Sequence, residues 1–182
     1  MAVEATVAVA SGIAVRSISL VAFGLDSVIE LASAGVLIWR LSHELRFGRE
    51  LSEEVERIAR RVAGGLLFAV AAYVVAAAGW SLWRGEAEAF SWPGLAIALL
   101  SIPIMLVLAR RKLALADRLG SAALRADAAE SLACLWLSLV VVLGLVAQLA
   151  FGAWWIDAVT SLAIVWLLVK EGREAWESEQ ND

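Results

Sequence analysis

Acidic side chains recur inside the most apolar stretches of this sequence, at spacings that would let them share one cation. Asp26 and Glu30 are four residues apart, and the same spacing recurs later in Glu130 and Cys134. On a helix, residues i and i+4 share a face with Cβ atoms about 6 Å apart, so each pair could close on one ion. Asp127 lies on the same stripe as Glu130 and could ligate the ion or support a ligand. We expect these five residues to form a metal site.

The two pairs lie in segments that resemble each other. Residues 17–30 align without a gap with residues 121–134, and serine, leucine and alanine recur at matching positions. In this alignment Asp26 matches Glu130, and Glu30 matches Cys134. Such an internal repeat predicts two related helices that bring their pairs together.

Ionisable side chains inside a membrane span are energetically costly. A carboxylate at the bilayer centre costs at least about 2.5–3.5 kcal/mol on insertion scales, so each needs a proton, a cation or a water-filled cavity. The structural alternative is that the acids pair with Arg16 and Arg125 and hold the helices together without any ligand. Glu4 and Asp157 are candidate accessory ligands, although Asp157 is also placed to cap the helix that it begins. Cys134 by itself could be a small packing residue.

The elements that position these residues are transmembrane helices. The chain is 62% hydrophobic with a mean hydropathy of +0.80, far from the soluble norm. Backbone groups in lipid must be paired within a helix, so we predict an all-α, polytopic six-helix bundle. One transmembrane domain, 1–176, would precede an acidic tail, 177–182, with spans at 1–15, 17–41, 62–84, 92–111, 120–150 and 154–171. The first would reach about 21 Å of the roughly 30 Å core, so it is short or lacks upstream residues.

Basic residues predict the orientation. Only Arg16 and Arg84 fall in the connections on one side, whereas the other side carries two basic groups. These follow the second span (Arg40, Arg46, Arg49, Arg57, Arg60, Arg61) and the fourth span (Arg110, Arg111, Lys112, Arg118, Arg125). The positive-inside rule then places both termini in the cytoplasm of a multi-pass protein of the cell (inner) membrane. We expect no cleaved signal peptide, because Glu4 interrupts the first apolar run.

Residues outside the acidic motifs have ordinary explanations. Residues 42–61 mix Glu and Arg at helical spacing, which predicts a solvated helical extension in which His43 is not a ligand. Amphipathic rings favour the headgroup region, and most tryptophans fall near predicted span ends (Trp39, Trp80, Trp83, Trp92, Trp154, Trp155).

Several classes of function find no support. The net charge of -4 and the absence of a basic domain argue against a nucleic-acid partner. A single cysteine, Cys134, excludes an internal disulfide framework. The spans contain no His and no motif that pairs a nucleophile with a base, so an enzyme is not expected and an intramembrane hydrolase is the weakest alternative.

The chemistry instead favours a transporter of divalent cations. Carboxylates bind metal when ionised, so metal arrival displaces protons and metal departure returns them, which is the basis of a metal/proton antiporter. Oxygen ligands favour Mg²⁺, Mn²⁺ or Fe²⁺, whereas a thiolate favours Zn²⁺ or Co²⁺. Because the set is mixed, the candidate metals are Zn²⁺, Mn²⁺, Fe²⁺, Co²⁺ and Ni²⁺. The metal would be the transported substrate, with no separate cofactor. The alternatives are a metal-binding membrane scaffold or sensor without transport, and a proton-coupled organic-cation exporter.

The same motifs resemble the cation diffusion facilitator (cation efflux) family, whose members usually place Asp-x-x-x-Asp on the second of six spans and His-x-x-x-Asp on the fifth. Asp26 and Glu30 resemble the first motif, Glu130 stands at the usual His position, and Cys134 stands at the usual Asp position. The resemblance runs from about residue 12 to residue 176 and implies metal efflux, often of zinc, by a homodimer. Members commonly add a C-terminal cytoplasmic domain, and we expect a short member without it, since residues 171–182 alone follow the last span.

Overall fold

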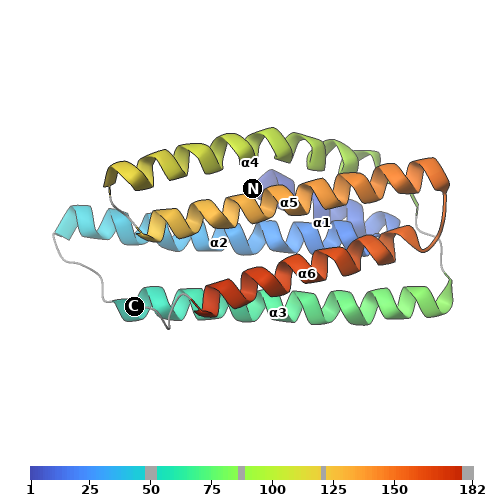
Figure 1. The fold of residues 1–182 in the computed structure, drawn as a ribbon, viewed down its shortest axis with the longest axis horizontal. Coiled ribbons are helices and arrows are strands. Elements are labelled where there is room, and N and C mark those ends of the chain that lie inside the picture. The colour runs from blue at the N-terminus through green and yellow to red at the C-terminus, as the bar shows by residue number, and fades with distance from the viewer. Residues whose placement is uncertain (48–52, 86–88, 120–121, 178–182) are drawn as a thin grey trace.

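The computed structural model describes residues 1–47, 53–85, 89–119 and 122–177. These residues form six α-helices and no strands, as predicted for an all-α bundle (Figure 1). In chain order the helices are α1 (Ala2–Val15), α2 (Ile18–Phe47), α3 (Glu53–Arg84), α4 (Trp92–Leu119), α5 (Ala122–Phe151) and α6 (Ile156–Glu177).

Four helices, α2, α3, α4 and α6, extend several residues beyond the spans predicted for them. Because α2 runs to Phe47 and α3 begins at Glu53, most of residues 42–61 is helical, as expected. The side chain of His43 and the tail 178–182 lie outside the described parts of the structure. One predicted boundary was wrong: Lys112, assigned to the connection after the fourth span, lies within α4, which continues to Leu119.

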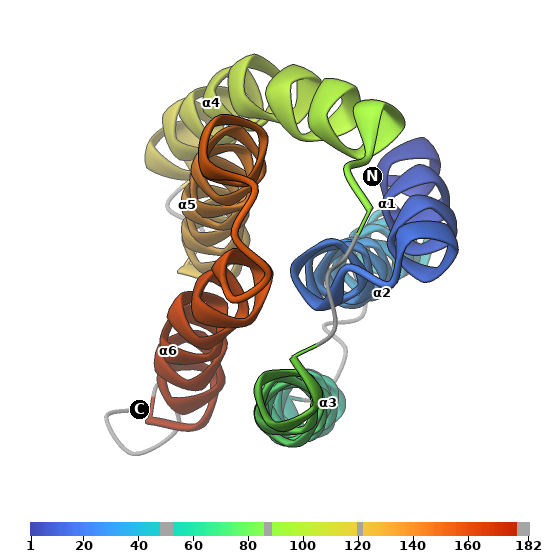
Figure 2. The same cartoon turned by 90° about the vertical axis from the view of Figure 1, so that its right-hand side faces the viewer.

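The helices pack as three neighbouring pairs, and α2 contacts more of the other helices than any other helix does. Consecutive helices run in opposite directions, and α1 lies against α2, α4 against α5, and α3 against α6 (Figures 1 and 2). Within the described residues α2 contacts α1, α3, α5 and α6, so it is the central helix. The acids of the second span therefore lie on the helix that most of the bundle surrounds.

Length and hydropathy fit a membrane location for most of the bundle. Four described segments are long and apolar enough to cross a bilayer, namely Ile18–Val36, Gly64–Arg84, Trp92–Arg118 and Asp127–Phe151. Helix α1 is apolar but shorter, as its sequence predicted. The tryptophans predicted at span ends are exposed, and the Arg84 guanidinium lies 4.7 Å from the centre of the Trp80 ring. Exposed rings near the ends of the apolar spans suit the interfacial region of a bilayer.

Two glycines bring α1 and α2 into backbone contact. A Cβ built on Gly12 would lie 2.8 Å from the backbone nitrogen of Val21, and one built on Gly24 would lie 2.8 Å from that of Val9. No side chain fits at these distances, so glycine is what permits the close approach. The contact holds Glu4 of α1 against the face of α2 that carries the acids.

Asp157 caps the start of α2 rather than the start of α6, the helix in which it lies. Its carboxylate accepts hydrogen bonds from Ser17 Oγ (2.6 Å), Ile18 N (2.7 Å), Ser19 N (3.3 Å) and Ser19 Oγ. An anion at a helix N-terminus satisfies amides that have no partner within the helix and complements the helix dipole. The sequence predicted a capping role for Asp157, but the recipient helix was wrong. The cap fixes the start of α6 to the α1–α2 turn.

Candidate cation site

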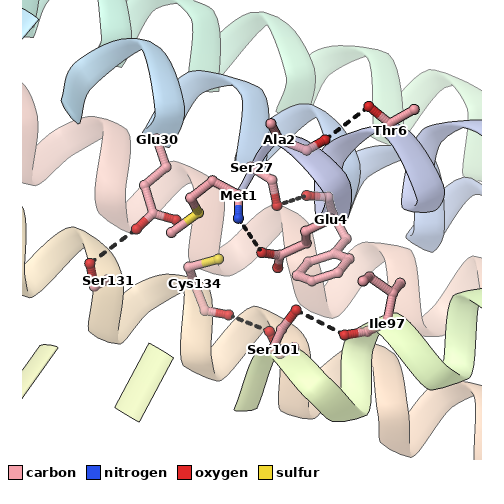
Figure 3. A network of polar contacts seen from close by, with 12 residues as sticks. Met1, Ala2, Glu4, Thr6, Ser27, Glu30, Ile97, Ser101, Ser131 and Cys134 are labelled. Atoms are coloured by element: carbon pink, nitrogen blue, oxygen red, sulfur yellow. Dashed lines mark hydrogen bonds and ion pairs between the residues drawn. The ribbon is translucent and has the colours of Figure 1, made fainter. Parts of the chain in front are cut away.

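A buried acidic cluster lies where α1, α2 and α5 meet. Asp26 and Glu30 on α2 are 4% and 2% exposed, and Cys134 on α5 is 1% exposed. Glu4 on α1 is 4% exposed. Figure 3 shows Glu4, Glu30 and Cys134 turned toward the same region between the three helices. The Cys134 thiol interacts electrostatically with the carboxyl groups of all three acids, so these four residues form one group, which we call the inner group.

Two carboxyl oxygens in the inner group are buried without a hydrogen-bond partner among the described residues. They are Oε1 of Glu4 and Oε2 of Glu30. Buried polar atoms in proteins nearly always have partners, because an unpaired one keeps its full desolvation penalty. The other oxygen of Glu4 lies 3.5 Å from the Met1 ammonium, and the Glu30 carboxyl group also neighbours the Cys134 thiol. The unpartnered oxygen that each acid still presents is what a cation or proton would satisfy.

A second group of polar side chains lies beside the first, between α4, α5 and α2. Lys112 Nζ lies 2.8 Å from Asp127 Oδ2 and donates to Ser131 Oγ at 2.8 Å. Ser131 Oγ in turn donates to Glu30 Oε1 at 3.0 Å (Figure 3). Glu130 interacts with Glu30 and Asp127, and it is less buried than the inner group. We call Lys112, Asp127, Glu130 and Ser131 the outer group.

The antiparallel course of α2 and α5 explains the division. The aligned residues of the repeat do not meet side by side, because one helix advances as the other returns. Glu30 therefore lies level with Ser131 and Glu130, while Asp26 lies nearer Cys134. The structure brings all five predicted ligands into one neighbourhood, but at two levels along the bundle.

The ligands are not gathered around one point in this conformation. Within the described parts of the chain, no three His, Cys, Asp or Glu side chains are arranged closely enough to hold a metal ion. Of the candidate accessory residues, Glu4 joins the inner group. Asp157 does not, since its oxygens are occupied at the start of α2. A bound ion would have to draw the acids together.

No role was predicted for Lys112 or Ser131 from the sequence, and the structural alternative to a metal site named other partners for the acids. The structural alternative paired them with Arg16 and Arg125, yet Arg125 pairs with the exposed Asp117 at 2.7 Å. A signal for Lys112 was present in the sequence. It shares one helical stripe with three buried α4 residues, Met105, Ala109 and Ala116. A lysine on an apolar stripe indicates a buried charge, which needs an acidic partner.

Comparison with known proteins gives the family. The cation efflux transmembrane domain matches residues 2–179, nearly the whole chain. The chain belongs to this family. A cation efflux protein is a transporter rather than an enzyme in the usual sense, so the chain is a multi-pass membrane protein that carries cations across a membrane. No curated protein matches the sequence.

Proposed function

We propose that this cation efflux protein exchanges a divalent transition-metal cation for protons. The ion would bind Asp26, Glu30, Glu130 and Cys134, with Asp127 in support and Glu4 as an accessory ligand from α1. The observation that carries the proposal is the pair of buried, unpartnered carboxyl oxygens on Glu4 and Glu30, which face a third acid and a thiol.

Proton exchange follows from the charge of the inner group. The inner group holds three carboxyl groups and one nearby cation, the Met1 ammonium, which lies 3.5 Å from Glu4 Oε2. One cation cannot balance three buried carboxylates, whose ionisation is opposed by desolvation and mutual repulsion. Without metal, protons supply the missing positive charge. A divalent cation that binds carboxylates displaces those protons, and its release takes them back. Coupling is therefore a property of the ligands and needs no separate proton pathway.

The separation of the ligands supports a site that assembles on binding. Alternating access requires the helices that carry a central site to rock against each other, so ligands on α1, α2 and α5 need not converge in every conformation. Carboxylates with one thiolate suit Zn²⁺, Co²⁺, Mn²⁺, Fe²⁺ or Ni²⁺. We propose Zn²⁺ or Co²⁺ as the first substrates to test, since the single sulfur favours the softer ions.

Proteoliposome flux tests the proposal directly. The protein is reconstituted into vesicles that contain either a metal-sensitive or a pH-sensitive dye, and metal is added outside. We expect metal uptake with proton release from the lumen, and loss of both signals in Asp26→Asn with Glu30→Gln. Asp117→Asn is the matched control, because it neutralises an exposed α4 acid outside both groups. If the double variant exchanges metal for protons as the wild type does, the site assignment is wrong.

The same experiment separates the alternatives. Metal binding by calorimetry without flux would establish a scaffold or sensor. Flux of a lipophilic organic cation that metal does not inhibit would establish an organic-cation exporter. Metal flux without a pH change would remove proton coupling from the proposal and leave the metal site.

The orientation and assembly belong to the same proposal. The basic connections support cytoplasmic termini in the cell membrane, and export would then run from the end of the bundle at which α4 ends and α5 begins. A homodimer is proposed from the family resemblance. Protease or thiol-reagent access in sealed vesicles checks the orientation, and the mass of the protein in nanodiscs checks the assembly.

A further inference from the structure

A lysine is built into the outer group, next to the candidate cation site. Lys112 comes from α4, and its side chain is only 14% exposed. Its ammonium forms a 2.8 Å ion pair with Asp127 Oδ2, donates to Ser131 Oγ at 2.8 Å, and reaches the Asp127 backbone oxygen at 3.4 Å. Both partners lie on α5, so the contacts tie α4 to α5.

The contacts of Lys112 continue to the inner group. Ser131 accepts from Lys112, and its single hydrogen has two acceptors within reach, Glu30 Oε1 at 3.0 Å and, less closely, the Asp127 backbone oxygen at 3.3 Å. Glu30 is also a neighbour of the Cys134 thiol. The positive charge of Lys112 is thus coupled to Glu30 through one hydroxyl, and three helices, α4, α5 and α2, meet at this chain.

The Lys112–Ser131–Glu30 contacts lie on one side of the inner group along the bundle axis. Asp127 precedes Cys134 by seven residues on α5, so it lies about 10 Å closer to the end at which α5 begins. A cation that approaches the inner group from that end reaches the Lys112–Asp127 pair first. The Lys112 ammonium neutralises the Asp127 carboxylate and repels the incoming cation. Such repulsion is strong where water is scarce.

A second ion pair on the same two helices shows what is special about Lys112. Arg125 on α5 pairs with Asp117 on α4 at 2.7 Å, but their side chains are 64% and 67% exposed. Exposed pairs of this kind contribute little to stability, whereas a buried pair is hard to separate unless its partners find new contacts. The bundle therefore contains a buried α4–α5 ion pair beside the site and an exposed one away from it.

We propose that Lys112 is a positioning residue that acts as a tethered cation: its contacts with Asp127 and Ser131 close the site toward the end of the bundle at which α4 ends. The site opens toward this end when Lys112 leaves Asp127, and the freed acids then face the entering metal ion. This inference rests on the proposed function, because it takes the inner group as the cation site.

Cys134 is a native probe of the closure. It is the only cysteine in the chain, and it is 1% exposed on the inner side of the Lys112 contacts. The rate at which a water-soluble methanethiosulfonate modifies Cys134 measures how often water-filled access to the inner group opens. The reaction needs neither metal nor transport, so it is independent of the flux experiment.

The variants keep the charge balanced. Lys112→Met with Asp127→Asn removes the buried ion pair without leaving a buried charge unpaired. Arg125→Met with Asp117→Asn is the matched control, since it removes the exposed pair between the same helices. The full-length proteins are labelled without metal in nanodiscs, where both ends are accessible, with one cationic and one anionic reagent of similar size.

We expect the Lys112–Asp127 double variant to be labelled about tenfold faster than the wild type by both reagents, as when a minor open state grows from about 1% to about 10%. Lys112→Arg, which keeps the charge, and the exposed-pair control should be labelled at the wild-type rate. Ser131→Ala removes the hydroxyl that bonds both Lys112 and Glu30 but leaves the Lys112–Asp127 ion pair in place. It should give a smaller acceleration, and it provides a test even if the double variant does not fold.

Three results would overturn the inference. One is a wild-type labelling rate in both the double variant and Ser131→Ala. Another is an equal acceleration in the exposed-pair control. The third is faster labelling by the cationic reagent alone, which would make Lys112 a charge barrier that does not close the path. If the wild-type protein shows no metal flux, that result counts against the proposed function and does not affect the labelling result.

Discussion

The cap that Asp157 places on α2 predicts a large and specific loss of stability. Asp157→Ala removes the acceptor for two backbone amides, Ile18 N and Ser19 N, and for two serine hydroxyls. The hydroxyls of Ser17 and Ser19 lie 3.2 Å apart, so one can donate to the other and the second can rotate, and we count only the two amides as a lower bound. A buried donor left unpaired costs about 1–3 kcal/mol, which gives a range of about 2–6 kcal/mol for two. We expect a loss of about 3 kcal/mol in the free energy of unfolding.

Unfolding in mixed micelles measures this loss. The purified protein is titrated with a denaturing detergent in a mild one, and helix content is followed by circular dichroism. Ser161→Ala is the control, because this buried α6 hydroxyl donates only to the Asp157 backbone oxygen, one turn earlier in its own helix, at 2.7 Å. It should cost less than about 1 kcal/mol. If the free energy of unfolding of Asp157→Ala lies within about 0.5 kcal/mol of the wild-type value, the two amides have found other acceptors and the Asp157 cap does not stabilise the protein.

Three further predictions concern helix packing and the site. Gly24→Ala should lower the free energy of unfolding by about 1–3 kcal/mol, because its Cβ would meet the Val9 backbone, whereas Gly79→Ala, with no atom within 4 Å of its Cβ, should be neutral or stabilising; mixed-micelle unfolding measures both. Zn²⁺ at about 100 times its Kd should raise the free energy of unfolding by about 2.7 kcal/mol, and an equal rise in Glu4→Gln at that concentration would show that Glu4 is no ligand. Cys134→Asp should shift the order of measured metal affinities from Zn²⁺ toward Mn²⁺, and an unchanged order would show that the thiol does not ligate the ion.

Sequence patterns gave the helices and the main acids because both follow from local rules. Apolar runs of membrane length predict helices, and an i,i+4 spacing places Asp26 and Glu30 on one face whatever the other helices do. Which α5 residues lie opposite these acids depends on the direction of the two helices and on how closely they approach. The spacing within one segment carries no information about either. Glu4 joins the inner group only because Gly12 and Gly24 let α1 touch α2. That approach is a tertiary feature.

Lys112 was missed for a different reason, because the positive-inside rule counts basic residues between spans and does not indicate which of them is buried. The positive-inside rule counts lysine and arginine between spans, and Lys112 follows two arginines at the predicted end of the fourth span. Helix α4 does not stop there, so Arg110 and Arg111 face outward while Lys112 turns inward to Asp127. The periodicity of buried residues along α4 distinguishes the three, whereas a count of charges does not.

The two levels of acids give Glu30 a role that the paired motifs alone do not suggest. Its Oε1 accepts from Ser131 of the outer group, while its Oε2 has no hydrogen-bond partner among the described residues and its carboxyl group neighbours the Cys134 thiol of the inner group. In the proposed exchange, an ion that has displaced Lys112 from Asp127 meets Glu30 before it reaches Asp26. Neutralising Glu30 should therefore reduce both metal affinity and the rate of flux, whereas neutralising Asp127 should change mainly the rate. Calorimetry and flux on Glu30→Gln and Asp127→Asn distinguish the two levels. An equal loss of affinity in both variants would show that the acids act as a single site.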